Sequence, residues 1–134
     1  MILNSLEKIR AYFSAEIFVR ENGIVIEDAS DGYAKLRLNV AGRHLDAFGF
    51  VSRAVLFTLA DFSAAPAAQF GREQEASVSF GVRILFPSPC RAAVLTAQAK
   101  RIEKTEDLDR YEVEIRNERE EIAARAFVSA YCKY

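Results

Sequence analysis

The amino-acid sequence predicts an α+β fold in which one antiparallel β-sheet wraps around a single long helix. A long apolar segment with helical composition, about residues 52–69, supplies the helix. Its side chains are apolar almost all round, which is typical of a helix enclosed by other elements. Extended segments with strand-like alternation flank it on both sides. The 134 residues are enough for one well-packed domain, residues 1–134, and too few for two.

The segment from about residue 4 to residue 20 is predicted to form a short N-terminal helix. Asn4 or Ser5 can cap its first turn, because either side-chain oxygen can accept a free backbone N–H. Three apolar residues then follow at helical spacing: Leu6, Ile9 and Phe13.

Residues 23–40 are predicted to form a β-hairpin. Asp31-Gly32 is a favoured turn pair between two segments rich in strand-forming residues. After the turn, four apolar residues alternate with polar ones: Ala34, Leu36, Leu38 and Val40. Successive side chains of a strand point to opposite faces, so this strand has one buried and one exposed face.

The central helix follows a loop that spans residues 41–51. Ser52 suits the position just before the helix, and Gly71 suits a position just after it. Pro66 lacks a backbone N–H and should kink or loosen the last turns.

Four further strands are predicted after the helix, in the order of a meander: residues 76–86, 92–102, 110–116 and 121–131. The third alternates most cleanly, with three apolar side chains on one face: Tyr111, Val113 and Ile115. An open sheet of this kind has unpaired edges, so a homodimer or a dimer of dimers is expected.

Composition excludes several classes of function. The formal net charge is −1, so the chain lacks the basic excess typical of nucleic-acid-binding proteins. The apolar segment is shorter than a membrane-spanning helix and contains Asp61 and Pro66, so no membrane span is expected. The N-terminal residues lack the pattern of a signal peptide, which favours a cytoplasmic location.

Cysteine and histidine are too scarce to indicate a metal site, and no metal is expected. Cys90 and Cys132 are far apart in the sequence and are expected to be reduced packing residues. His44 is the single histidine, so a metal site would have to be built from carboxylates, and the sequence contains no such cluster. As a loop residue, His44 is expected to be solvated or to pair with the nearby Asp46.

Asp61 is the one charged residue between residues 54 and 68. Burying a bare carboxylate costs free energy, so such a group is paired, is neutralised by a raised pKa, or serves a function. Two interpretations follow from the residues alone. Asp61 is either a structural carboxylate satisfied by a nearby N–H or arginine, or a functional group.

The chain resembles the hotdog-fold acyl-CoA thioesterases, in particular their phenylacetate-pathway (PaaI-like) branch. The resemblance covers about residues 15–132, and its best-matching blocks are FTLADFSAA, residues 57–65, and SVSFGVRILFP, residues 77–87. It implies a hotdog fold and hydrolysis of an acyl thioester, with Asp61 as general base or nucleophile. Coenzyme A is then part of the substrate or ligand, and no other cofactor is implied.

The resemblance also implies roles for Asp46 and Ser77. Asp46 falls where the family has an asparagine that helps to place water or the acyl group, and Ser77 falls on an assisting polar residue of the following strand. Without the resemblance, Asp46 is equally well explained as a local turn residue, and Ser77 as an ordinary strand residue.

The chain departs from the family pattern at two places. Ser52-Arg53-Ala54 stands where the family has His-Gly-Gly, and Phe86 stands where it has Arg or Lys. In the family, the backbone N–H at this helix start points at the thioester carbonyl, as an oxyanion hole requires. Arg53 keeps an N–H, but its side chain can crowd the approach or bind a phosphate or an acidic acyl group. Helix capping alone is enough to explain Ser52.

A second resemblance is to the ligand-binding domain of malonyl-CoA-responsive repressors of bacterial lipid synthesis, carried by AGRHLDAFG, residues 41–49. These proteins share the fold and bind acyl-CoA without cleaving it. They add a DNA-binding helix-turn-helix, for which there is no room before residue 20. The hypotheses are therefore a thioesterase, a non-catalytic protein that binds acyl-CoA or an acyl-carrier thioester, and a purely structural scaffold.

Basic residues on the predicted strands can contact the phosphates of coenzyme A: Lys35, Arg37, Arg83, Lys100 and Arg101. Exposed strand faces carry such charges in many soluble proteins, so the same residues also fit a solvated surface.

Overall fold

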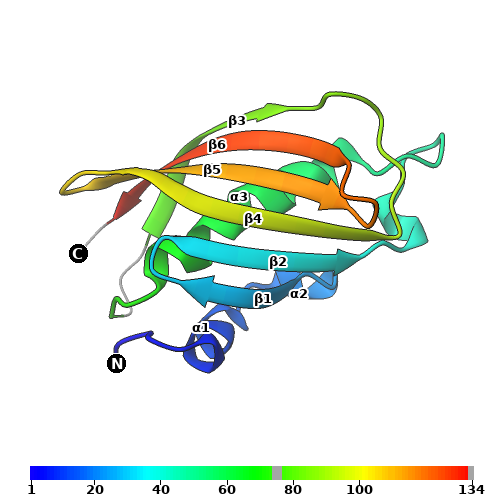
Figure 1. Ribbon diagram of the computed structural model, residues 1–134. Coiled ribbons are helices and arrows are strands. Elements are labelled where there is room, and N and C mark those ends of the chain that lie inside the picture. Colours follow the sequence, from blue (N-terminus) through cyan, green and yellow to red (C-terminus); the bar gives the residue numbers. More distant parts are fainter. Residues whose placement is uncertain (74–76, 133–134) are drawn as a thin grey trace.

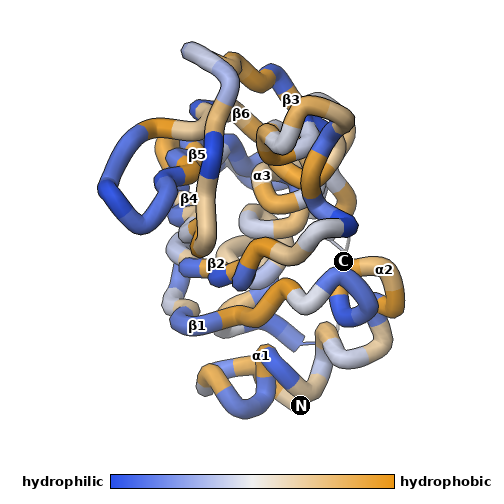
Figure 2. The backbone as a smooth tube through the Cα atoms, turned by 90° about the vertical axis from the view of Figure 1, so that its right-hand side faces the viewer, coloured by the Kyte–Doolittle hydropathy of each residue, from blue (hydrophilic) through white to orange (hydrophobic). Residues whose placement is uncertain are grey.

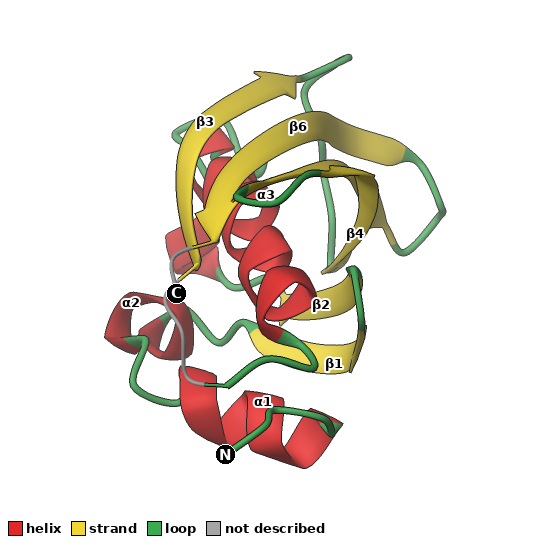
Figure 3. Ribbon diagram, turned by 90° about the vertical axis from the view of Figure 1, so that its left-hand side faces the viewer, coloured by secondary structure: helices red, strands yellow, loops and turns green. Residues whose placement is uncertain are grey.

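The computed structural model describes residues 1–73 and 77–132. The elements in chain order are α1 (Leu6–Phe13), α2 (Ile17–Glu21), β1 (Val25–Ser30), β2 (Tyr33–Asn39), η1 (Gly42–His44), α3 (Arg53–Gln69), β3 (Ser77–Leu85), β4 (Val94–Lys104), β5 (Leu108–Asn117) and β6 (Ile122–Cys132). Within the described ranges, six strands form one antiparallel sheet that curves around α3 (Figure 1, Figure 3). The predicted α+β architecture is confirmed.

The strand order in the sheet is β1-β2-β4-β5-β6-β3. The predicted four-strand meander is therefore wrong for β3, which pairs with β6 rather than with β4. Alternation identifies a strand but not its neighbour, and Pro87 and Pro89 follow β3 where a tight hairpin would need backbone N–H groups. The connection to β4 crosses the sheet instead, which leaves β1 and β3 as the two edges (Figure 1).

Helix α3 contacts all six strands of the described chain, and Figure 2 shows hydrophobic residues along it and along the surrounding strands. Ser52 caps it as predicted, because its Oγ accepts the N–H of Ala54 at 3.2 Å. The helix continues through the buried Pro66, and Gly71 follows its end with a φ of 80°. Enclosure is incomplete, since Phe57 is 43% exposed.

The predicted N-terminal helix is two helices, α1 and α2. Ser5 caps α1 by accepting the N–H of Lys8. At the end of α1, the Ser14 hydroxyl donates to the Ala11 carbonyl at 2.7 Å. In a continued helix this carbonyl would accept a backbone N–H instead, so the side chain competes with continuation of the helix. The apolar face of α1 is buried as predicted, and the Phe13 ring meets the Phe62 ring of α3 edge-on at 5.4 Å.

The hairpin of β1 and β2 forms around Asp31-Gly32, as predicted. Gly32 has a φ of 75°, and a Cβ there would lie 2.8 Å from Nη1 of Arg101. Glycine is therefore required both by the turn and by the close approach of β4. The predicted buried face of β2 is confirmed, since Ala34, Leu36 and Leu38 are fully buried.

The expectation of a solvated His44 is wrong, because the residue is only 1% exposed. Its Nδ1 accepts the N–H of Ala41 at 2.9 Å, so Nε2 carries the proton and donates to the Asn22 carbonyl at 3.0 Å. Burial, together with the nearby Arg43, holds the pKa of His44 below its ordinary value. His44 is thus a neutral structural residue that ties the 41–51 loop to the end of α2.

Candidate functional site

Asp61 lies in the middle of α3 and is partly exposed. Its carboxylate accepts a short hydrogen bond, 2.6 Å, from the hydroxyl of Ser79 on β3. Within the described residues no ion pair involves Asp61, so it is not sealed against an internal arginine. A carboxylate held by one hydroxyl can still accept a proton from water or a further hydrogen bond from a ligand.

Asp61 opens onto a cavity of about 360 Å³ between α1, α3 and the start of β3. Ser77 and Ser79 line this cavity with it, so the structure brings together two of the three predicted catalytic residues. The sequence analysis missed Ser79. Alternation along a strand puts Ser79 on the same face as Ser77, and that was the available signal.

Among the described residues, two of the three backbone N–H groups at Ser52, Arg53 and Ala54 have an acceptor. The N–H of Ser52 donates to the His44 carbonyl at 2.8 Å, and the N–H of Ala54 is taken by the Ser52 side chain. Within the described part of the chain, the N–H of Arg53 has no acceptor. It lies at the positive end of the helix dipole, so among Ser52, Arg53 and Ala54 it is the amide that can stabilise an oxyanion.

Asp46 and Arg53 line a second cavity of about 280 Å³, together with Phe50 and Phe86. One carboxylate oxygen of Asp46 accepts the N–H groups of Phe48 and Phe50, at 2.8 and 3.0 Å. Asp46 therefore makes the local turn that its loop position suggested. Within one chain, the structure does not bring Asp46 to Asp61, because the two residues line different cavities.

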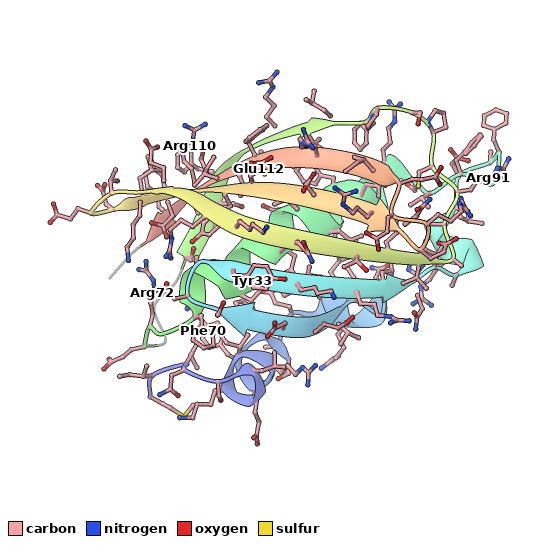
Figure 4. The ribbon with its side chains drawn as sticks, in the orientation of Figure 1. Tyr33, Phe70, Arg72, Arg91, Arg110 and Glu112 are labelled. Atoms are coloured by element: carbon pink, nitrogen blue, oxygen red, sulfur yellow. The ribbon has the colours of Figure 1, made fainter. Side chains whose placement is uncertain are left out.

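Arg91 fixes the wall of the second cavity. Its guanidinium lies 4.3 Å from the centre of the Phe50 ring and donates to the carbonyls of Phe48 and Gly49. Figure 4 shows Arg91 at one end of the sheet and Arg72 at the other. The second cavity therefore lies at the end of the molecule where α3 begins.

Arg101 does not form part of a free basic patch. Its guanidinium pairs with Asp31 at 2.9 Å and with the fully buried Asp109 at 3.2 Å, and its side chain is 15% exposed. Tyr111 also donates to Asp109, at 2.8 Å, and burial together with that carboxylate raises the pKa of Tyr111. Arg72 is a further partner of Asp109, at 3.5 Å. Arg101 is thus held in a structural ion-pair cluster, and its role in binding coenzyme A stays a prediction.

The other basic residues predicted to bind coenzyme A are on the outer face of the sheet. Arg83 on β3 lines a shallow groove with Arg110 on β5, and Lys100 on β4 is exposed. Figure 4 shows Arg110 and Glu112 on the same strand. None of these residues lines the cavity that contains Asp61 in the described structure.

Within residues 1–73 and 77–132, no group of three or more His, Cys, Asp or Glu side chains is arranged to hold a metal ion. Cys90 is a partly buried free thiol, and burial raises its pKa. The side chain of Cys132 lies outside the described residues. No helix in the described ranges is long and apolar enough to cross a membrane.

Comparison with solved structures identifies the architecture, whereas neither family models nor curated proteins give a match. The E. coli PaaI protein from the phenylacetic acid degradation operon has a TM-score of 0.84 at 24% identity, over 93% of this chain and 90% of that chain. A thioesterase from Staphylococcus aureus has a TM-score of 0.83 at 12% identity, over 88% of this chain and 99% of that chain. Zebra fish thioesterase superfamily member 2 has a TM-score of 0.82 at 16% identity, over 95% of this chain and 97% of that chain.

At such identities a structural likeness establishes the fold, whereas an activity has to be argued from the site. The neighbours include PaaI proteins, the branch that the sequence resembles. The chain therefore has the hotdog fold, shared with PaaI-like and other thioesterase-superfamily proteins.

Proposed function

We propose that this protein hydrolyses acyl thioesters, with coenzyme A as the thiol carrier and Asp61 as the catalytic carboxylate. The main support for this proposal is the position of Asp61. Its carboxylate accepts a hydrogen bond from Ser79 at 2.6 Å, and it faces a cavity large enough for an acyl group. The walls contributed by Phe13 and Phe62 are apolar, as an acyl chain requires.

The chemistry can follow either of two routes. As a general base, Asp61 takes a proton from water while the water oxygen bonds to the thioester carbon, and the C–S bond then breaks to release the thiolate. As a nucleophile, Asp61 displaces the thiolate and forms an anhydride, which water then hydrolyses. In both routes negative charge develops on the carbonyl oxygen, and the free N–H of Arg53 is the donor proposed to stabilise it.

A homodimer, alone or as part of a dimer of dimers, would complete this site. The Asp61 cavity includes the beginning of β3, whereas the Arg53 cavity includes Phe86, just beyond the end of β3. If two β3 edges pair antiparallel, the first cavity of one copy lies beside the second cavity of the other. The edge also exposes large apolar side chains, with Val78 and Phe80 half exposed, which supports a partner.

A second candidate function is binding of an acyl-CoA without turnover. It is favoured by Arg53 and Phe86, which occupy the second cavity where the family has small or basic residues. A guanidinium there can hold an anionic group of the ligand, and its bulk can restrict approach to the Arg53 amide.

Thiol release from a panel of short, long, aromatic and dicarboxylic acyl-CoAs tests the proposal. We expect turnover that Asp61→Asn abolishes, whereas the matched Asp46→Asn retains most of it, because Asp46 accepts backbone hydrogen bonds in a turn. Binding is measured by calorimetry on the same panel. Binding without turnover supports the second candidate function, and the absence of both binding and turnover overturns both candidate functions.

The cytoplasmic location stays a prediction.

A further inference from the structure

Gln69, the last residue of α3, is a buried amide without hydrogen bonds. The residue is 2% exposed, and neither Oε1 nor Nε2 has a partner among the described residues. Buried side-chain amides are nearly always paired, because an unpaired group loses its hydrogen bonds to water and gains none. A ligand that supplies both a donor and an acceptor would remove this cost.

Gln69 lines the same cavity as Asp61. Asp61, Ala65 and Gln69 are four residues apart and share one face of α3, so Asp61 and Gln69 are separated by about 12 Å along the helix axis. Helical side chains lean toward the N-terminus, which directs Gln69 toward Asp61. An acyl group whose thioester carbon is at Asp61 would therefore extend toward Gln69.

The charges on the described lining of the cavity disfavour an acidic acyl group. Its described lining contains the carboxylates of Asp61 and Glu16 and no lysine, arginine or histidine. A free carboxylate at the end of the acyl group would be repelled by both of these side chains, whereas a neutral hydroxyl or carboxamide would not. Such a group can donate to Oε1 of Gln69 and accept from its Nε2.

We propose that Gln69 is a specificity residue that selects acyl groups carrying a neutral hydrogen-bonding substituent, such as a hydroxyl, at the end remote from the thioester. The inference rests on the proposed function, since it takes Asp61 to mark the position of the thioester. The three rotatable side-chain bonds of Gln69 allow its amide to turn into the cavity when the ligand arrives. An unsubstituted acyl group leaves the amide unpaired and binds less well.

The test compares octanoyl-CoA with ω-hydroxyoctanoyl-CoA. The corresponding hexanoyl and decanoyl pairs are measured in parallel, because the separation of Asp61 and Gln69 is known only along the axis of α3. In the wild-type protein we expect kcat/KM, or 1/Kd if there is no turnover, to be about tenfold higher for the hydroxylated member of one pair. Suberyl-CoA, which ends in a carboxylate, should be the poorest substrate of its length. Gln69→Met keeps the length of the side chain and removes its hydrogen bonds, so it should abolish the preference for the hydroxylated member of the pair.

Gln69→Leu serves as a second apolar variant, and both variants should melt no lower than the wild-type protein, because an unpaired buried amide is removed. Equal rates and affinities within every pair overturn the role of Gln69 while leaving the thioesterase proposal intact. A preference that survives in both variants also overturns it. Loss of turnover and binding for every thioester overturns the proposed function and this inference together.

Discussion

The guanidinium of Arg53 lies 4.8 Å from the centre of the Phe86 ring, so the two departures from the thioesterase pattern contact each other. Phe86 removes a cation from the position after β3, and Arg53 returns one to the same cavity from the start of α3. The contact also holds the Arg53 side chain against the ring. The two residues are therefore in direct contact, and changing one is expected to affect the other.

A double-mutant cycle on Arg53 and Phe86 measures this coupling. We expect Arg53→Gly and Phe86→Leu to be non-additive in the free energy of unfolding by about 0.5–1 kcal/mol. Phe86→Leu should also lower kcat/KM, because the released guanidinium can cover the Arg53 amide, and the double variant should recover it. Phe86→Tyr keeps the aromatic face and serves as the control. Additive effects in both measurements would show that the contact carries no function.

Ser79 is expected to position the Asp61 carboxylate. Ser79→Ala removes the 2.6 Å hydrogen bond and should lower kcat about tenfold, with a smaller change in KM. Ser77→Ala is the matched control on the same strand, and its effect should be smaller because the Asp61 carboxylate is held by Ser79. A larger loss in Ser77→Ala than in Ser79→Ala would return the assisting role to Ser77, as the family resemblance implied.

His44 should make the protein less stable in mild acid. Its pKa in the folded protein is below the ordinary value of 6.5, so the unfolded chain takes up the proton first as the pH falls. The stability that it contributes is fully present above pH 6.5 and is lost as the pH falls from there through the folded pKa. Urea unfolding across about pH 5 to 8 measures the slope, and His44→Gln should remove this part of it. An unchanged slope in the variant would assign the acid sensitivity to other groups.

Asp109 is expected to dominate the stability of the ion-pair cluster at the far end of the sheet. Asp109→Asn leaves Arg101 and Arg72 beside a neutral group in a buried position, so it should lower the free energy of unfolding by about 3–5 kcal/mol. Asp31→Asn removes the second carboxylate partner of Arg101. The Asp31 side chain is 70% exposed, so this substitution should cost about 0–1 kcal/mol. Chemical denaturation of both variants checks this contrast, and similar losses would contradict it.

The edge of β3 should form the dimer interface. Val78→Lys combined with Phe80→Lys places two charges on the half-exposed apolar edge and should give a monomer in light scattering, with loss of thioesterase activity. Phe18→Lys on α2 changes an aromatic residue that is even more exposed but lies elsewhere, and it should leave the assembly intact. A dimer that survives the double substitution would place the interface on another surface.

Sequence patterns alone predicted the hairpin around Asp31-Gly32, the cap at Ser52 and the position of Asp61 on the central helix. All three depend on neighbours within a few residues, through turn geometry, capping and periodicity. Such local signals are set by the backbone of one element. They identify the element and which of its faces is buried, whatever the rest of the chain does.

Tertiary structure decided which remote residues meet. The place of β3 beside β6 brings Ser79 to Asp61, and the place of β4 between β2 and β5 commits Arg101 to Asp31 and Asp109. The unpaired amide of Gln69 likewise depends on what surrounds the end of α3. Strand order and crossing connections leave no periodic signal in the sequence, because alternation is the same whichever neighbour a strand has. The sequence thus determined the elements and the central carboxylate, and the packing of the sheet around α3 decided the partners that surround that carboxylate.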